Sequence, residues 1–174
     1  MTTAVGTLSG GEHLTMDRGA VIMSDVNSEL PDALDHGMTA DWAVVDRDGI
    51  RHEVSGTFLG IGSTHRPYHK NHPETEWAPK RVHCSTCRWT EIRLFRLDDG
   101  RFCVINCGAS DVPGERDLIR VSYVDTAFEV VEFLTVTDRG TQNVSLPMPA
   151  RRALAMSAGH DASVRDAYIN SPVT

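Results

Sequence analysis

The chain has 174 residues, of which 40% are hydrophobic and 24% are charged, and its formal net charge is −7. This balance is typical of one globular domain, or at most two small ones, and excludes a fibrous or wholly disordered chain. No apolar run of about 18 residues occurs, so the sequence predicts no membrane contact. Residues 1–5 have neither a basic region nor an apolar core, so we expect no secretory signal and a cytoplasmic location.

The negative charge is concentrated near the N-terminus. Residues 1–50 carry nine acidic and two basic residues, whereas residues 51–100 carry six acidic and eight basic ones. A nearly neutral body argues against strong general affinity for DNA. We therefore interpret residues 1–40 as an acidic arm that is flexible or docks on a partner. Residues 41–174 are predicted to form a single β-rich α+β domain.

The predicted domain begins with a β-hairpin over residues 42–61, whose turn is the run Asp-Arg-Asp-Gly at 46–49. Glycines at 56, 60 and 62 indicate bulges or a close backbone approach in its second strand. A long polar loop follows over residues 63–83, with three prolines and four histidines. Loops of this length are usually functional, or are held by something other than a hydrophobic core.

The clearest hairpin predicted by the sequence spans residues 88–105, with a turn at 98–100, and a further strand is expected over 117–124. Asp125 and Thr126 can cap a helix over 127–134, which we favour over a strand because its apolar residues have helical spacing. A short strand at 144–146 and helices at 149–158 and 162–169 complete the domain. The predicted fold is a small antiparallel β-rich core with short C-terminal helices.

The strongest chemical motif is the Cys-x-x-Cys knuckle of Cys84 and Cys87, which places two thiolates on one turn. Histidines lie upstream of it at positions suited to complete a four-ligand zinc site. We favour His69 and His72, and then His65, as ligands, and predict a structural zinc ion that pins this loop. The alternative is that the thiols are merely buried and the histidines are solvated.

Two other uses of this region stay open in the sequence. Cys103 and Cys107 could complete a four-cysteine ribbon, but an extended strand would hold them about 13 Å apart, so we expect them to be buried apolar residues. The other is a catalytic ion, with Glu74 or Glu76 as the base of a hydrolase or deaminase. A nuclease that uses His65, His69, Asn71 and His72 is a variant of this alternative. The His-Glu-x-x-His motif is absent, and the deaminase pattern is not met because His83 precedes Cys84.

Basic residues are concentrated around the knuckle and the hairpin, with aromatic residues between them. Such a set can bind nucleic acid or a protein partner if its members share one face. The alternative is a solvated sheet face whose arginines pair with nearby acids. The residues that we predict for this face are Arg88, Trp89, Arg93, Arg96 and Arg101.

Three stretches resemble small uncharacterised proteins of actinobacterial phages. They are residues 84–89 (Cys-Ser-Thr-Cys-Arg-Trp), residues 111–117 (Asp-Val-Pro-Gly-Glu-Arg-Asp) and residues 128–132 (Phe-Glu-Val-Val-Glu). The resemblance covers roughly residues 80–170. It carries no assigned activity, and it implies a phage accessory protein that works in the host cytoplasm.

These observations together favour a zinc-stabilised protein that acts by binding rather than by catalysis. Another protein, from the host or the phage, is the expected partner, and nucleic acid is the less favoured one. A metal-dependent hydrolase using the same cysteines and histidines is the main alternative. A virion component is a further one, and self-association into a homo-oligomer would favour it.

Overall fold

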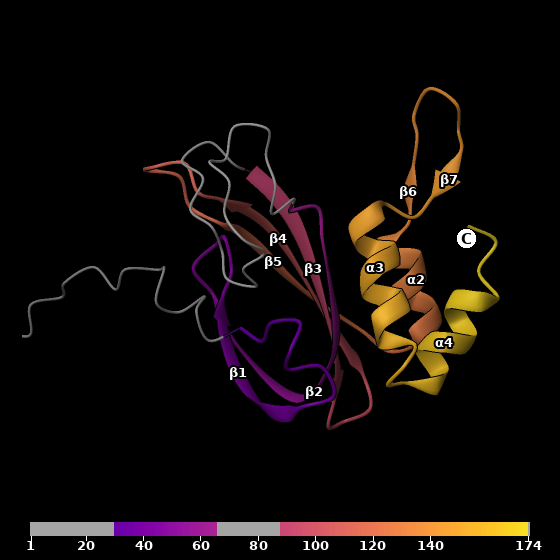
Figure 1. Cartoon of the computed structure of the whole chain (residues 1–174), viewed down its shortest axis with the longest axis horizontal. Helices are drawn as coiled ribbons and strands as arrows, with labels where there is room; N and C mark the ends of the chain where they lie inside the picture. The colour runs from indigo at the N-terminus through magenta and orange to yellow at the C-terminus, as the bar shows by residue number, and fades with distance from the viewer. Residues whose placement is uncertain (1–29, 66–87, 174) are drawn as a thin grey trace, which may run out of the picture.

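The structure is a computed structural model that describes residues 30–65 and 88–173. Five strands form one antiparallel sheet in which each strand pairs with the next along the chain (Figure 1). Tight turns join the first strand to the second and the third to the fourth, as the sequence predicts. Most of the connection from the second strand to the third lies outside the described residues. The strands are β1 (Thr39–Val45), β2 (Arg51–Ser63), β3 (Arg88–Leu97), β4 (Phe102–Ser110) and β5 (Leu118–Val124).

Three helices follow the sheet and cover one of its faces (Figure 1). The helix predicted over 127–134 is confirmed, and Thr126 and Glu129 form the capping box that starts it. The two later helices are confirmed as well, and Asp161 caps the last one. The elements are α2 (Ala127–Leu134), α3 (Met148–Ser157), α4 (Ala162–Ile169) and a small hairpin of β6 (Val136–Thr137) and β7 (Val144–Ser145).

The sheet is buried on both faces. One hydrophobic cluster joins Ile92, Leu94 and Val104 to the three helices. A second cluster lies on the opposite face and includes Trp42, Phe58, Phe95 and Ile105. Because successive strand residues point to opposite faces, β3 contributes to both clusters and is buried along most of its length. The α+β class expected from the sequence is confirmed.

Glycines bring α3 close to the sheet. A Cβ atom at Gly62 would lie 1.8 Å from the carbonyl oxygen of Pro149, and one at Gly60 would lie 2.9 Å from Met156. No larger residue fits at Gly62 unless α3 moves away. The close backbone approach that the sequence predicts for this strand is therefore confirmed, and it sets how α3 packs on β2.

The sheet curves until its two ends meet. The backbone N–H of Arg47, in the turn between β1 and β2, donates to the carbonyl of Ile119 in β5 at 2.9 Å. The hairpin expected over residues 42–61 is confirmed, and β1 begins at Thr39. No helix in the described part of the chain is long and apolar enough to cross a membrane. The loop predicted to be pinned by zinc lies almost wholly outside the described residues.

Candidate functional site

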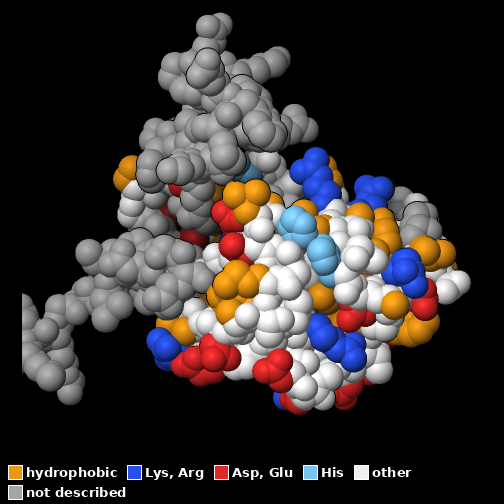
Figure 2. All heavy atoms as spheres, turned by 60° about the horizontal axis from the view of Figure 1, so that its bottom comes forward, with side chains coloured by type: hydrophobic (Ala, Val, Ile, Leu, Met, Phe, Trp, Pro, Cys, Tyr) orange, Lys and Arg blue, Asp and Glu red, His pale blue; other side chains and the backbone are white. Residues whose placement is uncertain are grey.

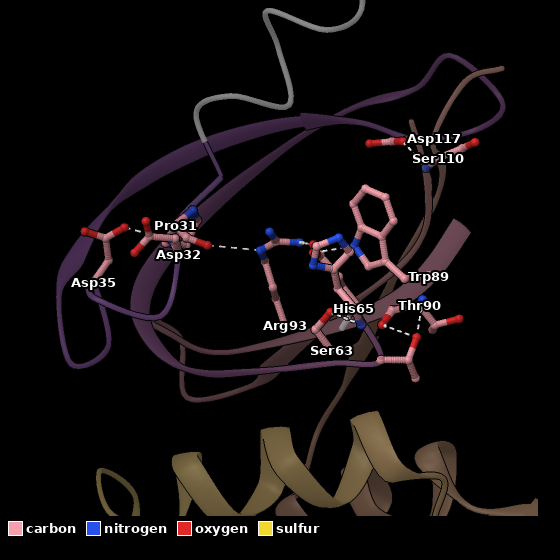
Figure 3. A network of polar contacts seen from close by, with 12 residues as sticks. Pro31, Asp32, Asp35, Ser63, His65, Trp89, Thr90, Arg93, Ser110 and Asp117 are labelled. Carbon is pink, nitrogen blue, oxygen red and sulfur yellow. Dashed lines mark hydrogen bonds and ion pairs between the residues drawn. The ribbon is translucent and has the colours of Figure 1, made fainter. Parts of the chain in front are cut away.

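The structure describes six of the ten residues that the sequence predicts for functional sites. His69, His72, Cys84 and Cys87 lie outside the described residues. His65, Trp89 and Arg93 are brought together on the face of the sheet that lies away from the helices (Figure 3). Arg88, Arg96 and Arg101 lie elsewhere. We take the cluster around Trp89 as the candidate site.

The cluster is built on β3, whose alternation points Trp89, Glu91 and Arg93 to the same face. Glu91 and Arg93 form an ion pair with 2.9 Å between Oε2 and Nη1, and their side chains are only 10% and 8% exposed. The indole Nε1 of Trp89 donates to the other carboxylate oxygen of Glu91 at 2.7 Å. A buried ion pair is tolerated more easily when hydrogen bonds also satisfy its partners. Here Trp89 satisfies one carboxylate oxygen of Glu91, and the contact of the other with Arg93 is an ion pair without hydrogen-bond geometry.

Arg93 also anchors the segment that precedes β1. Its Nε donates to the carbonyl oxygen of Pro31 at 3.0 Å, as Figure 3 shows. Asp32 and Asp35 hold this segment in a turn, because the backbone N–H of Asp32 donates to the Asp35 carboxylate at 2.8 Å. Leu30 packs against the hydrophobic cluster on the same face. Residues 30–35 therefore cover one end of the sheet.

His65 lies at the other side of Trp89, with 4.6 Å between the two ring centroids. Its backbone N–H donates to Ser63 Oγ at 3.0 Å, so its position follows directly from the end of β2. The ring atom Nε2 is buried and has no hydrogen-bond partner among residues 30–65 and 88–173. A buried nitrogen in this state needs an explanation, because nearly all buried polar atoms are paired.

The predicted arginine face is not brought together. Arg93 and Arg96 are three residues apart in one strand, so their side chains point to opposite faces of the sheet. Arg96 lies over the ring of Phe102, 4.4 Å from its centroid, and 3.8 Å from a carboxylate oxygen of Asp161. Trp89 is buried, with 7% of its surface exposed.

The two remaining arginines of that set are exposed and paired with acids. Arg101 contacts Asp99 in the turn before β4, with 2.8 Å between Nη2 and Oδ2. Arg88 makes a two-point contact with Glu115, and this guanidinium lowers the pKa of the Glu115 carboxyl to about 2. The arginines predicted for a binding face are therefore better described by the alternative interpretation, in which they pair with nearby acidic residues.

The two cysteines of β4 are buried, as the sequence analysis expects. Cys103 lies in the cluster opposite the helices, and burial raises the pKa of its thiol to about 12. Cys107 belongs to the same continuous strand, four residues further on. Residues this far apart in an extended strand are about 13 Å from each other and cannot ligate one ion. The four-cysteine ribbon is therefore wrong.

Sequence reasoning missed a second polar group, which lies at the far end of β2 from His65. It joins Asp46, His52 and Tyr123 through side-chain hydrogen bonds. Asp46 was predicted only as a turn residue, and the other two carry no motif. His52 and Tyr123 are 71 positions apart, so no local pattern could reveal their contact.

No group of three or more His, Cys, Asp or Glu side chains within residues 30–65 and 88–173 is arranged to hold a metal ion. Comparisons with protein-family models, with curated proteins and with solved structures found no match to this chain. The function is therefore argued from the geometry of the described residues and from the motifs on either side of them.

Proposed function

We propose that this chain is a zinc-stabilised binding protein with a protein partner, and that His65 is one of the zinc ligands. The observation that carries the proposal is the buried Nε2 atom of His65, which has no partner within the described part of the chain. A zinc ion bound at that lone pair would remove the cost of leaving it unsatisfied. The resemblance to actinobacterial phage proteins supports an accessory role in the host cytoplasm.

The ligand set that we propose combines His65 with Cys84, Cys87 and one histidine of the pair His69 and His72. The other ligands lie between His65 and the start of β3. Both of these points are near Trp89, because the His65 ring is in tilted contact with the indole and β3 begins one residue before Trp89. One ion bound there would tie the end of β2 to the start of β3. Such an ion contributes directly to folding free energy.

The surface proposed for the partner lies on the helix side. A groove of about 490 Å³ runs between α2 and α4, and its walls include Phe128, Val131 and Val144. Phe128 is 63% exposed. Hydrophobic side chains gather on this end of the molecule, at the right of Figure 2. An exposed apolar groove of this kind suits an apolar segment of another protein.

Metal analysis of protein purified without added metal tests the zinc site. We expect one zinc per chain in the wild type, and loss of zinc with a lower melting temperature in Cys84→Ser/Cys87→Ser. His65→Ala should weaken zinc binding, and His160→Ala is the matched control. No metal in the wild type would contradict the proposal. Zinc that is lost while the fold stays fully stable would instead favour the hydrolase alternative.

Binding of a partner is tested with two exposed phenylalanines of α2. Phe128 lines the groove, whereas Phe133 is 48% exposed and is not among the residues that line it. We expect Phe128→Ser to abolish capture of host or phage proteins that bind the wild type, and Phe133→Ser to retain it. Equal loss in both variants, or none in either, would contradict a role for this groove.

A further inference from the structure

Three side chains, one from the β1–β2 turn and two from separate strands, form a hydrogen-bonded chain where the curved sheet closes. Asp46 follows β1, His52 belongs to β2 and Tyr123 belongs to β5. His52 Nε2 lies 3.0 Å from Asp46 Oδ2, and His52 Nδ1 lies 3.3 Å from the hydroxyl oxygen of Tyr123. The hydrogen-bonded chain therefore runs from the carboxylate of Asp46 through the imidazole of His52 to the hydroxyl group of Tyr123.

The contacts of Asp46 fix the direction of the proton in this chain. Its Oδ1 accepts from the backbone N–H groups of Asp48 and Ile50, both at 2.9 Å, and its pKa is lowered, mainly by the hydrogen bond with His52. A carboxylate can only accept, so the neutral His52 ring carries its proton on Nε2. Nδ1 then presents a lone pair, and Tyr123 donates its phenolic proton to it.

The phenol opens onto a hollow of about 320 Å³. Arg101, Glu53, Asp98 and Asp99 contribute to its walls, so acids outnumber bases. An anionic substrate is disfavoured there because it would meet a net negative charge. Tyr123 is 39% exposed and lines this hollow.

We propose that Tyr123 is a nucleophile for an uncharged or cationic ester, with His52 as its general base and Asp46 as the positioning residue. A nucleophile within hydrogen-bond reach of a base that a third group orients is the arrangement of covalent catalysis. A separation of 3.3 Å is within the range found before substrate binds. This site lies at the opposite end of β2 from His65 and is independent of zinc.

The proposed step transfers an acyl group. The Tyr123 oxygen forms a bond to the ester carbonyl carbon while its proton passes to His52 Nδ1. The bond between that carbon and the leaving oxygen breaks, and the leaving oxygen takes the proton from His52. Water then adds to the acyl carbon, the bond to Tyr123 breaks, and the phenol regains a proton through His52. The products are an acid and an alcohol.

The test is acetylation of the full chain by 4-nitrophenyl acetate, followed by the release of nitrophenol and by peptide mass spectrometry. We expect an acetyl group on Tyr123, no labelling at that position in Tyr123→Phe, and a rate about 10²-fold lower in His52→Gln. Tyr168→Phe is the matched control and should react like the wild type. 4-Nitrophenyl phosphate, an anion, should not react.

Three results would overturn the proposal. They are no acetylation of the wild type at Tyr123, an unchanged rate in His52→Gln, and faster reaction with the phosphate ester than with the acetate. The melting temperature of His52→Gln distinguishes a structural role of His52 from a catalytic one. If His52 were purely structural, the variant would be less stable but would acetylate Tyr123 at the wild-type rate. Asp46→Asn should lower the rate while Tyr123 stays reactive. Asp48→Asn, two positions further along the same turn, should leave the rate unchanged.

Discussion

At the scale of single residues, substitutions are expected to be most costly at the buried ion pair of Glu91 and Arg93. Glu91 and Arg93 neutralise each other, and each also has a second partner, Trp89 for the carboxylate and Pro31 for the guanidinium. Removing one charge leaves the other buried without compensation, which is much more costly than removing both. The pair therefore adds little to the net free energy of unfolding. Its main effect is to fix the position of residues 30–35 through the hydrogen bond between Arg93 and Pro31.

The first prediction follows from this pair. Arg93→Met should lower the free energy of unfolding by about 3–5 kcal/mol, because Glu91 stays charged and buried. The double variant Glu91→Leu/Arg93→Met should recover most of the loss. Urea denaturation of the two variants and of the wild type measures both effects. A double variant that is less stable than Arg93→Met would show that the ion pair is not the cause.

A second prediction concerns acid. The hydrogen bond from Arg88, followed by the hydrogen bond from Ser110 and the charge of Arg88, lowers the pKa of Glu115 from 4.5 to about 2. Since the pKa is lowered in the folded state, the stabilisation is complete above pH 4.5 and is lost as the pH falls toward 2. Melting temperatures of the wild type and Glu115→Gln should therefore differ at pH 6 and converge near pH 2. A constant difference across this range would contradict the assigned cause.

At the scale of elements, α2 depends on its N-terminal cap. Thr126 Oγ1 accepts from the backbone N–H of Glu129 at 3.2 Å, and the Glu129 carboxylate accepts from the backbone N–H of Thr126 at 3.0 Å. Thr126→Ala should cost about 1 kcal/mol of stability, whereas Thr126→Asp should retain the cap. Thermal unfolding compares the two variants, and equal losses would show that the cap is not the cause.

The contact between α3 and β2 gives a larger effect. Gly62→Ala would place its Cβ 2.6 Å from the backbone nitrogen of Ala153, so the helix must move. We expect a loss of about 1–3 kcal/mol or more from overpacking. Gly108→Ala in β4 is the control, because its Cβ would meet Leu118 at an ordinary 3.7 Å. Similar stabilities for the two variants would contradict the close approach.

At the scale of the whole molecule, the segment before β1 closes one end of the sheet. A chain beginning at residue 37 lacks Leu30 and Pro31, whereas one beginning at residue 30 keeps both. The shorter chain should be less stable by about 1–3 kcal/mol, because Arg93 loses a buried hydrogen-bond acceptor. Chemical denaturation of the two truncated chains isolates this contribution. Equal stabilities would show that the segment adds nothing to the fold.

The sequence by itself determined the local structure of the described chain. The turn at residues 98–100 and the cap at Thr126 were both predicted, because each depends on interactions within a few positions. The helix over 127–134 was predicted from its spacing despite its valines. The pinned loop, its zinc and the acidic arm expected over residues 1–40 stay predictions; of the arm, the structure describes residues 30–40, where Pro31 contacts Arg93.

Only the tertiary structure decided which side chains meet. The sequence analysis placed Arg93 on the surface because charged side chains usually lie there, and placed Trp89 with it because it is interleaved with arginines. However, β3 is covered on both faces, so its alternation does not separate buried from exposed positions. The contact between His52 and Tyr123 arises because the curvature of the sheet brings β2 to β5. Curvature and register are set by packing across the whole chain, and no short stretch of sequence encodes them.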